Sequence, residues 1–446
     1  MRYIPMTEQD RQAMLASMGI SSVDELFADI PEHLRMAERL NLPPALSEAE
    51  LLRHMKELAD ANVNLTETVS FMGGGVYDHL IPSIVKHLIS RGEFLTAYTP
   101  YQAEISQGVL QSIFEYQTLI AELTGMDAAN ASMYDGATAL AEATLMACNA
   151  ARRDVVVLPE NLHPEWKEVC ENYLSNQDVK IKYLPYNEET GTIDHAALKE
   201  FDPKELACVV VQQPNFFGII EDVDPISEFI HAGGGLLVMA VDPISLGLLK
   251  SPGEYGADIV VGDGQSLGNP MSFGGPSLGF FATTDKLVRR MPGRIVGETV
   301  DGDGRRGFVL TLQTREQHIR REKATSNICS NQALNALAAT IYLSVLGKQG
   351  FKEVAYQCLQ KTAYLRKKIS EETRFKVKFR GHSFREFVVT GDVDWEEINR
   401  KLLTEGFLGG LPLKRFGMPN DVLFAVTEAR TKAEIDRLVE LLGGMS

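Results

Sequence analysis

The sequence lacks any pair of cysteines at the spacing of a metal site or a disulfide framework. Its five cysteines are scattered, with no CxxC motif, and lie at Cys148, Cys170, Cys208, Cys329 and Cys358. This spacing argues against both kinds of site. We therefore expect reduced and mostly packed thiols, and we predict no metal and no cysteine nucleophile.

Basic charge is also scarce, because 60 acidic residues outnumber 44 Lys and Arg residues and give a formal net charge of -16. No block rich in Lys and Arg stands out, so we predict no nucleic-acid partner. Long apolar runs are missing too: a run such as Leu236–Val241 falls far short of the roughly 20 residues of a membrane span. The first ten residues lack the apolar core of a signal peptide. We expect a cytoplasmic protein with no membrane partner.

What the sequence does contain is the composition of a globular protein, with 44% hydrophobic and 23% charged residues. Its length favours two lobes over one. Residues 1–65 alternate helix-like segments with breaks at Pro31 and Pro43–Pro44. We predict an N-terminal helical arm, which either packs on its own protomer or wraps a neighbour; we favour the neighbour.

The middle of the chain alternates helices with short apolar strands. A helical pattern runs from Gln107 to Gly125, and six strand-like runs follow: Asp154–Leu158, Val179–Tyr183, Ala207–Val211, Leu236–Val241, Ile259–Val261 and Leu278–Ala282. Near-continuous apolar strands separated by helices are typical of a mostly parallel sheet that is covered on both faces. We predict an α/β domain over residues 66–325.

The last part of the chain has the pattern of a smaller lobe. A helical stretch at Asn331–Tyr342 precedes three strand candidates and two helices: Phe375–Phe379, Glu386–Thr390, Leu423–Thr427, Asp394–Glu405 and Thr431–Leu442. We predict a compact α+β domain over residues 326–446.

Three runs give a more specific pattern than the architecture does: Phe71–Pro82, Glu93–Gly108 and Phe114–Gly136. Together they resemble the P-protein family of the glycine cleavage system, the glycine decarboxylases, and the likeness extends roughly to the C-terminus. The resemblance implies a fold-type I pyridoxal phosphate (PLP) transferase-like fold. In many bacteria this enzyme is split into two chains, and the sequence resembles subunit 1, the N-terminal-half type.

The resemblance also implies an activity and partners. The family's enzyme decarboxylates glycine with PLP as electron sink and passes the aminomethyl group to the lipoyl group of H-protein. It implies that subunit 2 supplies the PLP lysine and that two copies of each chain form an α2β2 heterotetramer. We therefore expect this chain alone to be inactive.

Gln265 is the residue on which this interpretation depends. The run Asp258–Pro276 resembles the strand-then-glycine segment in which fold-type I enzymes anchor PLP as a Schiff base on a lysine. Gln265 stands where the lysine is expected, and an amide cannot form that bond. We predict no covalent cofactor and no catalytic residue on this chain.

A relict pocket is expected around the same strand ends. Ser132, Asp135, Gly136 and Thr138 lead from a turn into a helix, where free backbone N–H groups can cradle a phosphate. A carboxylate at this place satisfies those amides itself and repels phosphate. We therefore favour an N-cap role for Asp135 over a working phosphate site.

Three further residues belong to the expected relict pocket. Asp242 ends a buried strand, where these enzymes place the acid that pairs with the PLP ring nitrogen; a strand-end turn before Pro243 is the alternative that we favour. His163 either sits over a ring face or has a structural role. Asn215 follows another strand end and either contacts a ligand or builds a turn.

One segment is the candidate for a contribution to the partner's active site. It is rich in hydrogen-bonding side chains, lacks strong periodicity and precedes a core helix, and its candidate residues are Tyr98, Thr99, Tyr101, Gln102 and Glu104. The alternative is that the two tyrosines only pack an interface.

Two other functions stay open. The first is an autonomous PLP aminotransferase or desulfurase that uses another lysine, such as Lys250, although Lys250 precedes the strand that should lead to the cofactor lysine. The second is a scaffold subunit that binds its partner or H-protein without shaping the pocket.

Overall fold

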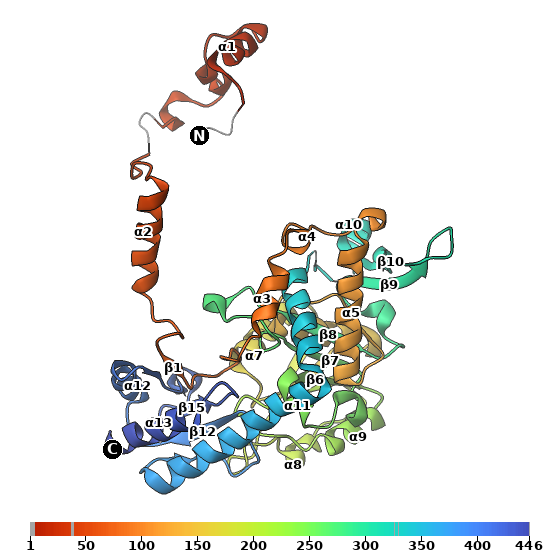
Figure 1. Ribbon diagram of the computed structural model, residues 1–446. Helices are drawn as coiled ribbons and strands as arrows, with labels where there is room; N and C mark the ends of the chain where they lie inside the picture. Colours follow the sequence, from red (N-terminus) through yellow and green to blue (C-terminus); the bar gives the residue numbers. More distant parts are fainter. Residues whose placement is uncertain (1–4, 37–39, 325, 329, 446) are drawn as a thin grey trace. The chain divides into compact units, whose positions relative to one another are not determined.

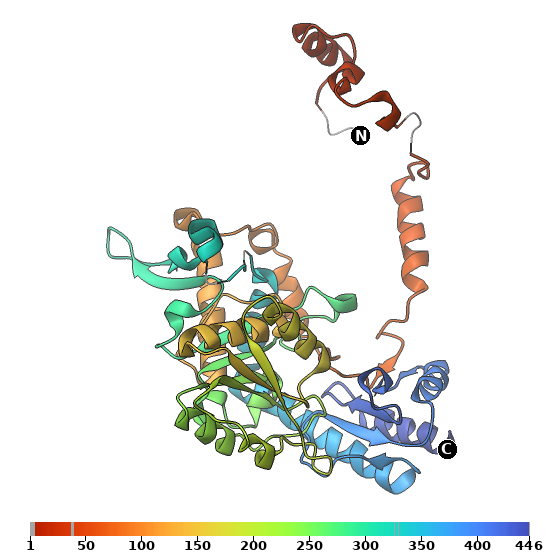
Figure 2. The ribbon, with the colours of Figure 1, turned by 180° about the vertical axis from the view of Figure 1, so that it is seen from behind.

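The computed structural model describes residues 5–36, 40–324, 326–328 and 330–445. The chain divides into two compact units, Met1–Val63 and Asn64–Ser446 (Figures 1 and 2). None of the helices in the described part combines the length and hydrophobicity that crossing a bilayer requires. The predicted division of the second unit at residue 325 stays a prediction.

The first unit is helical. Two α-helices, α1 (Glu8–Ser17) and α2 (Glu48–Asp60), each begin with a capping box, in which an N-cap hydroxyl and an N3 carboxylate satisfy each other's backbone amides. Two short 3-10 turns lie between them, η1 (Val23–Phe27) and η2 (Glu32–Leu34). Among its described residues only Leu15 is buried. The described part of this unit therefore has no hydrophobic core of its own.

The second unit is built on a seven-stranded sheet in the order β2-β8-β7-β6-β5-β3-β4. Its strands are β2 (Ala128–Ala129), β3 (Val155–Pro159), β4 (Lys180–Leu184), β5 (Leu206–Gln213), β6 (Leu236–Val241), β7 (Ile259–Asp263) and β8 (Gly279–Thr283). The five strands β7, β6, β5, β3 and β4 run parallel, and β8 and β2 add antiparallel pairs at the edge next to β7. The predicted mostly parallel α/β sheet is confirmed.

Both faces of this sheet are covered, because successive residues of each strand point into different cores. Val209 and Val211 pack in the core beneath α5 (Gln107–Thr124) and α9 (Asp224–Ala232). Val210 packs in the opposite core with α6 (Gly136–Ala151) and α7 (Pro164–Leu174). A strand buried on both faces needs apolar side chains at every position, which explains the continuous apolar runs of the sequence.

Two features between the sheet and the C-terminal part go beyond the prediction. Residues 292–307 are rich in Gly and Arg, and most of them lie in an antiparallel hairpin of β9 (Ile295–Val300) and β10 (Arg306–Thr311). The following helix, α11, extends over Ala333–Glu372 and changes direction at Gly347, whose φ is 59°. Periodicity indicated only the first part of this helix, because the helix turns its apolar face from one core to another.

A four-stranded antiparallel sheet, ordered β11-β12-β15-β14, forms the C-terminal core. Its strands are β11 (Lys376–Val377), β12 (Glu386–Thr390), β14 (Leu411–Pro412) and β15 (Asp421–Ala425), covered by α12 (Trp395–Thr404) and α13 (Lys432–Gly444). The predicted smaller α+β layer is present. Two short strands pair in parallel, β1 (Val69–Ser70) with β13 (Phe407–Leu408). This pairing joins the segment before the glycine run, Gly73-Gly74-Gly75, to the C-terminal part.

Candidate functional site

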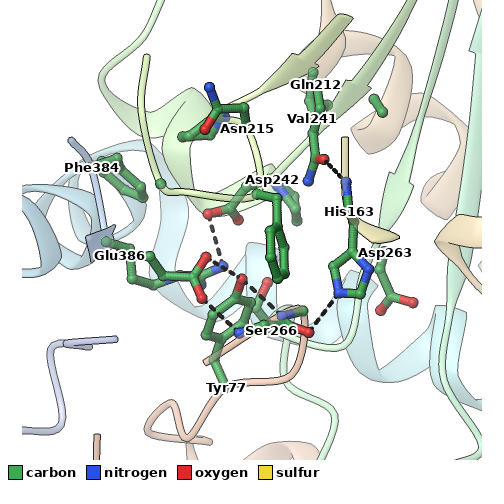
Figure 3. A pocket seen from close by; sticks show the side chains of 18 of the residues that line it. Tyr77, His163, Gln212, Asn215, Val241, Asp242, Asp263, Ser266, Phe384 and Glu386 are labelled. Atoms are coloured by element: carbon green, nitrogen blue, oxygen red, sulfur yellow. Dashed lines mark hydrogen bonds and ion pairs between the residues drawn. The ribbon is translucent and has the colours of Figure 1, made fainter. Parts of the chain in front are cut away.

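A small cavity lies at the carboxyl ends of β5, β6 and β7, where open α/β sheets bind their ligands (Figure 3). Its volume is about 50 Å³. Its lining comes from the three strand ends, residues 74–77, the start of α7 and the start of β12. It includes Tyr77, His163, Trp166, Gln212, Asn215, Asp242, Asp263, Ser266, Arg385 and Glu386. Of the predicted pocket residues, His163, Asn215 and Asp242 line the cavity, whereas Ser132, Asp135, Gly136, Thr138 and Gln265 lie outside its lining.

Gln265 stands at the position where the family resemblance leads one to expect the cofactor lysine. It is buried, and both polar atoms of its side-chain amide form hydrogen bonds. Its Oε1 accepts a hydrogen bond from the Tyr77 backbone N–H at 3.0 Å, and its Nε2 donates to the Tyr77 carbonyl at 3.1 Å. Nε2 also donates to the Asn269 carbonyl at 2.8 Å. The amide therefore clamps the backbone of another segment of the chain over the cavity.

Arg385 contributes a buried cation that sequence reasoning missed. One of its guanidinium nitrogens lies 2.8 Å from Asp242 Oδ2, and the guanidinium carbon lies 3.3 Å from the centre of the Tyr77 ring. Asp242 is thus held by an internal cation, at the place where the family resemblance expects an acid that faces a ring nitrogen. It also accepts from the Ile244 backbone N–H, as the alternative strand-end role requires.

Glu386 closes the cavity from the other side. Its carboxylate accepts from the Tyr77 hydroxyl and from the Gly74 backbone N–H, both at 2.7 Å. Burial raises the pKa of Glu386, and burial together with this carboxylate raises the pKa of the Tyr77 hydroxyl. A Cβ added at Gly73 would lie 2.2 Å from Glu386 Oε1, so the glycine run permits this close approach.

The start of α6 is filled by carboxylates. Asp135 is its N-cap, and Oδ1 accepts from the Thr138 backbone N–H at 2.8 Å. The Gly136 N–H points instead at Asp263 Oδ2, at 3.1 Å, and Asp263 also accepts from the Gln265 N–H and the Ser277 hydroxyl. Burial raises the pKa of Asp263 to about 6. Protein carboxylates thus accept from the backbone N–H groups at which the sequence suggested a phosphate cradle.

His163 has a structural role at the cavity wall. Its Nδ1 accepts from the Glu165 backbone N–H at 3.2 Å, which makes His163 the N-cap of α7. The proton is therefore on Nε2, which donates to the Gly74 carbonyl at 2.8 Å. Burial lowers the pKa of His163 and favours this neutral form.

Asn215 builds a turn and has no amide atom left over. Its Oδ1 accepts from the backbone N–H groups of Phe217 and Ile219, and its Nδ2 donates to the Gly191 carbonyl and to Glu221. Burial raises the pKa of Glu221 to about 7. Of the two roles that the sequence left open for Asn215, the geometry favours the turn.

Pyridoxal phosphate does not fit this place. An apolar cavity that holds benzene has roughly 150 Å³, three times the volume here, and the cofactor is larger than benzene. The phosphate position presents Asp135 and Asp263, and the acid Asp242 is already paired with Arg385.

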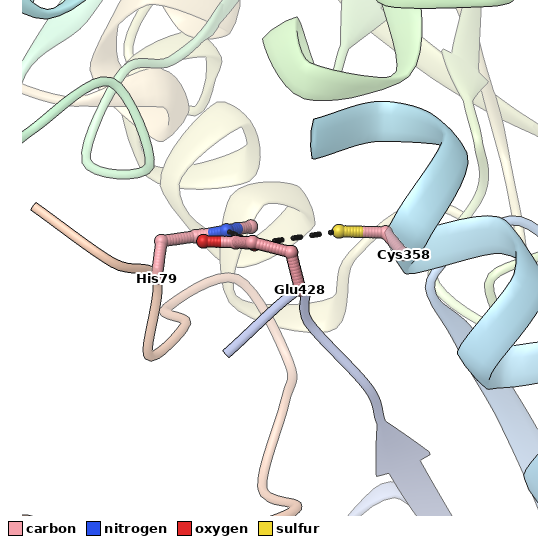
Figure 4. Close-up of side chains that lie close together, drawn as sticks. All are labelled: His79, Cys358 and Glu428. Atoms are coloured by element: carbon pink, nitrogen blue, oxygen red, sulfur yellow. Dashed lines mark hydrogen bonds and ion pairs between the residues drawn. The ribbon is translucent and has the colours of Figure 1, made fainter. Parts of the chain in front are cut away.

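His79, Cys358 and Glu428 bring three metal-ligand types together (Figure 4). Arg385 Nη1 donates to His79 Nε2 at 2.6 Å, so the His79 proton is on Nδ1 and is donated to Glu428 at 2.6 Å. Both ring nitrogens are occupied, and burial raises the pKa of the Cys358 thiol, which opposes the thiolate a metal needs. With a guanidinium beside it, the cluster is a hydrogen-bonded support for Arg385 and not a cation site.

The segment from Tyr98 to Glu104 contrasts with the buried, hydrogen-bonded side chains around the strand-end cavity. The side chain of Tyr98 is 89% exposed and that of Tyr101 51%, and Gln102 and Glu104 are exposed as well. Thr99 is half-buried and lines, with Tyr98 and Arg294, a cavity of about 200 Å³ with mostly apolar walls. The segment ends in the turn η3 (Ala103–Ile105), just before α5.

Comparisons with known proteins agree on one family. The family model described as glycine cleavage system P-protein matches residues 1–442. A probable glycine dehydrogenase (decarboxylating) subunit 1 from Desulforamulus reducens is 56% identical over 448 aligned residues, with 100% of both chains covered. A crystal structure of glycine decarboxylase (P-protein) in inhibitor-bound form matches with a TM-score of 0.92 and 45% identity, again over 100% of both chains.

A more distant structure bears on the fold alone. It is a C-DES variant with glycine covalently linked to its PLP cofactor, which matches with a TM-score of 0.63 at 15% identity and covers 85% of this chain and 97% of that one. The architecture on which PLP enzymes are built is thus present, around a cavity filled by the chain's own side chains.

Proposed function

The chain belongs to the glycine cleavage system P-protein family, and from that premise we propose that it is the lysine-less subunit of a two-chain glycine dehydrogenase (decarboxylating). It acts in glycine cleavage, which the description of the family and the glycine dehydrogenase (decarboxylating) subunit 1 name of its relatives support. A second, homologous chain supplies the lysine and holds PLP. The expected assembly is the α2β2 heterotetramer, and its expected setting is the cytoplasm.

One observation carries this proposal: the Gln265 amide is held by hydrogen bonds to the Tyr77 backbone and to Asn269, next to the cavity at the strand ends. An amide offers no nucleophilic amine to the cofactor's aldehyde. The surrounding carboxylates and the buried Arg385 leave neither the room nor the charge that the cofactor needs. The chemistry must therefore take place on the partner.

In the complex, the cofactor supplies an electron sink for the decarboxylation of glycine, and the aminomethyl group passes to the lipoyl group of H-protein. This chain contributes the segment with Tyr98, Thr99, Tyr101, Gln102 and Glu104 to the partner's active site. Its exposed hydroxyl, amide and carboxylate groups suit a role in orienting a polar ligand. The large sheet holds the segment in place through α5.

The autonomous alternative has no support from Lys250. Its ammonium nitrogen lies 3.0 Å from Asp224 and 4.1 Å from the centre of the Tyr255 ring, and Lys250 does not line the cavity. A pure scaffold role is separated from the proposal by the effect of the Tyr98 segment on turnover.

The test is glycine-dependent carbon dioxide exchange with lipoylated H-protein, measured for this chain alone, for subunit 2 alone and for the mixture. We expect exchange in the mixture and none with this chain alone. Exchange by the lone chain would overturn the proposal. An inactive mixture of chains that assemble would do the same.

A further inference from the structure

Two glutamines of α5 face the hairpin of β9 and β10. On one side of this helix they flank two apolar residues, in the order Gln107, Leu110, Phe114 and Gln117. These positions are three or four residues apart, the spacing that brings side chains to the same side of a helix. Leu110 is buried in one cluster with Phe308 of β10, and the ring centroids of Phe114 and Phe308 lie 5.3 Å apart. The hairpin therefore lies along this side of α5 (Figure 1).

The two glutamine amides bind the backbone of the hairpin in the same way. Gln117 Nε2 donates to the Val296 carbonyl and its Oε1 accepts from the Val296 N–H, both at 2.9 Å. Gln107 Nε2 donates to the Phe308 carbonyl and its Oε1 accepts from the Phe308 N–H, both at 2.8 Å. In an antiparallel pair, alternate residues direct these backbone groups away from the neighbouring strand. Each glutamine thus satisfies the outer edge of one strand.

Gln107 forms one hydrogen bond that Gln117 has no counterpart for. Its Nε2 also donates to the Ala103 carbonyl at 2.8 Å, so both N–H groups of the amide are used. Ala103 begins the turn η3, at the end of the segment from Tyr98 to Glu104, and packs against the cluster that contains Phe308. Gln107 therefore couples the position of this segment to that of the hairpin.

Arg294 holds the same segment at a second point. Its Nη2 donates to the Tyr101 hydroxyl at 3.1 Å, and its guanidinium carbon lies 5.5 Å from the centre of the Tyr101 ring. Arg294 directly precedes β9, so both contacts run from the segment to the hairpin. Side chains that orient a ligand need neighbouring groups that fix their backbone. The Gln107 and Arg294 contacts are suited to this role.

We propose that Gln107 is a positioning residue, which sets the place of the Tyr98–Glu104 segment through its bond to the Ala103 carbonyl. It acts through the segment and not by contact with substrate or cofactor. The inference rests on the proposed function, because the segment must contribute to the partner's active site for its position to affect turnover. A displacement of about 1 Å in such a segment can lower a rate up to about a hundredfold.

The test compares two matched variants, Gln107→Met and Gln117→Met. Each replaces an amide by an unbranched side chain that donates no hydrogen bond, and each removes the two bonds to one hairpin strand. Only Gln107→Met also removes the bond to Ala103. Gln117 is 7% exposed, whereas Gln107 is exposed. Gln117→Met should therefore destabilise the isolated chain more, because it leaves buried backbone groups without partners.

The kinetic effects should have the opposite order. In the reconstituted complex, Gln107→Met should lower kcat about threefold to tenfold, while Gln117→Met leaves it unchanged. A purely structural role would give the larger kinetic loss in the less stable variant. Gln107→Lys should recover part of kcat, because its ammonium can donate to the Ala103 carbonyl although it cannot accept from Phe308.

A double substitution tests whether Gln107 acts through the segment. Tyr98→Ala should lower kcat by a smaller factor in the Gln107→Met chain than in the wild-type chain, because both changes affect one segment. Factors that simply multiply would show that Gln107 acts elsewhere and would overturn the inference.

Hydrogen exchange of the isolated chain gives a readout that needs no partner. The amides of Ile105 and Ser106 donate within the turn, to the carbonyls of Gln102 and Ala103. Gln107→Met should raise the exchange rate of peptides that cover residues 99–106, and Gln117→Met should not. Unchanged exchange in Gln107→Met would contradict the positioning role.

Equal kinetic losses in the two methionine variants, or no loss in Gln107→Met, would overturn the inference as well. If Gln107→Met does not assemble with its partner, Gln107→Lys and the exchange of the isolated chain decide. An inactive wild-type mixture would instead remove the proposed function, while hydrogen exchange would still decide whether Gln107 holds the segment. The two failures are therefore distinguishable.

Discussion

Two polar regions of the second unit differ in the burial and pairing of their side chains. The cavity at the strand ends is closed by the chain's own groups, with Arg385 against Asp242 and Tyr77 against Glu386. The region around Tyr98 and Tyr101 is open, and its side chains are fixed on one side and exposed on the other. A buried polar network stabilises a fold to the extent that its members are paired, and here the Nε of Arg385 is left without a hydrogen-bond partner, whereas exposed polar groups are available to a ligand. The difference predicts separate effects on stability and on turnover.

The largest effect is expected at Arg385. Replacing it by Leu leaves the carboxylates of Asp242 and Glu386 buried without their cation, which costs about 3–5 kcal/mol of the free energy of unfolding. Urea denaturation of the isolated chain measures this loss. The control is Arg380→Leu, which removes an exposed arginine paired with Glu189 and should cost less than about 1 kcal/mol. Equal losses of unfolding free energy in the two variants would contradict the view that the buried pairing of Arg385 stabilises the fold.

The pH dependence of stability is the next test. The pKa of Asp263 is raised from 3.8 to about 6 in the folded chain, so the folded state binds the proton more tightly than the unfolded state does. The associated stability is fully present below pH 3.8 and is lost as the pH rises to about 6, by roughly 1–3 kcal/mol.

Asp263→Asn should remove that part of the profile. The difference in unfolding free energy between wild type and variant then changes in favour of the variant between pH 4 and 6. A constant difference across this range would show that folding does not raise the pKa of Asp263.

Gln265→Lys should cost about 1–3 kcal/mol, because the Tyr77 and Asn269 backbone groups lose buried partners. It should not create a PLP enzyme, since Asp135 and Asp263 still fill the phosphate position. Ultraviolet–visible titration with PLP and borohydride reduction check this. The control is Gln177→Lys, a surface change that adds the same amine. An imine in Gln265→Lys beyond the level of this control would contradict the filled cavity.

The smallest effect on stability is expected in the open region. Tyr98→Ala should change the free energy of unfolding by less than about 0.5 kcal/mol, as exposed substitutions do, while it lowers the turnover of the complex at least about tenfold. Tyr356→Ala, at another exposed tyrosine, should change neither. Unchanged turnover with intact assembly would leave only a scaffold role.

The sequence predicted much of this fold because its apolar runs are continuous and short. Val209 to Val211 must be apolar on both faces of the sheet, and this requirement is visible in the sequence. The long α11 was only partly predicted, since Gly347 breaks its periodicity.

The filled cavity was harder to predict. The contact of Tyr77 with Glu386 joins positions 309 residues apart, and no pattern of neighbouring residues predicts it. One signal was present: Arg385 and Glu386 begin an apolar strand, where charged side chains need buried partners. Asp135 was identified as an N-cap because that role depends on neighbouring residues alone.

The most direct test locates the cofactor in the assembled complex. After borohydride reduction of the complex with PLP, peptide mass spectrometry of both chains identifies every modified lysine. The account predicts one modified lysine on subunit 2 and no specific modification of this chain. A stoichiometric PLP adduct on any residue of this chain would contradict it.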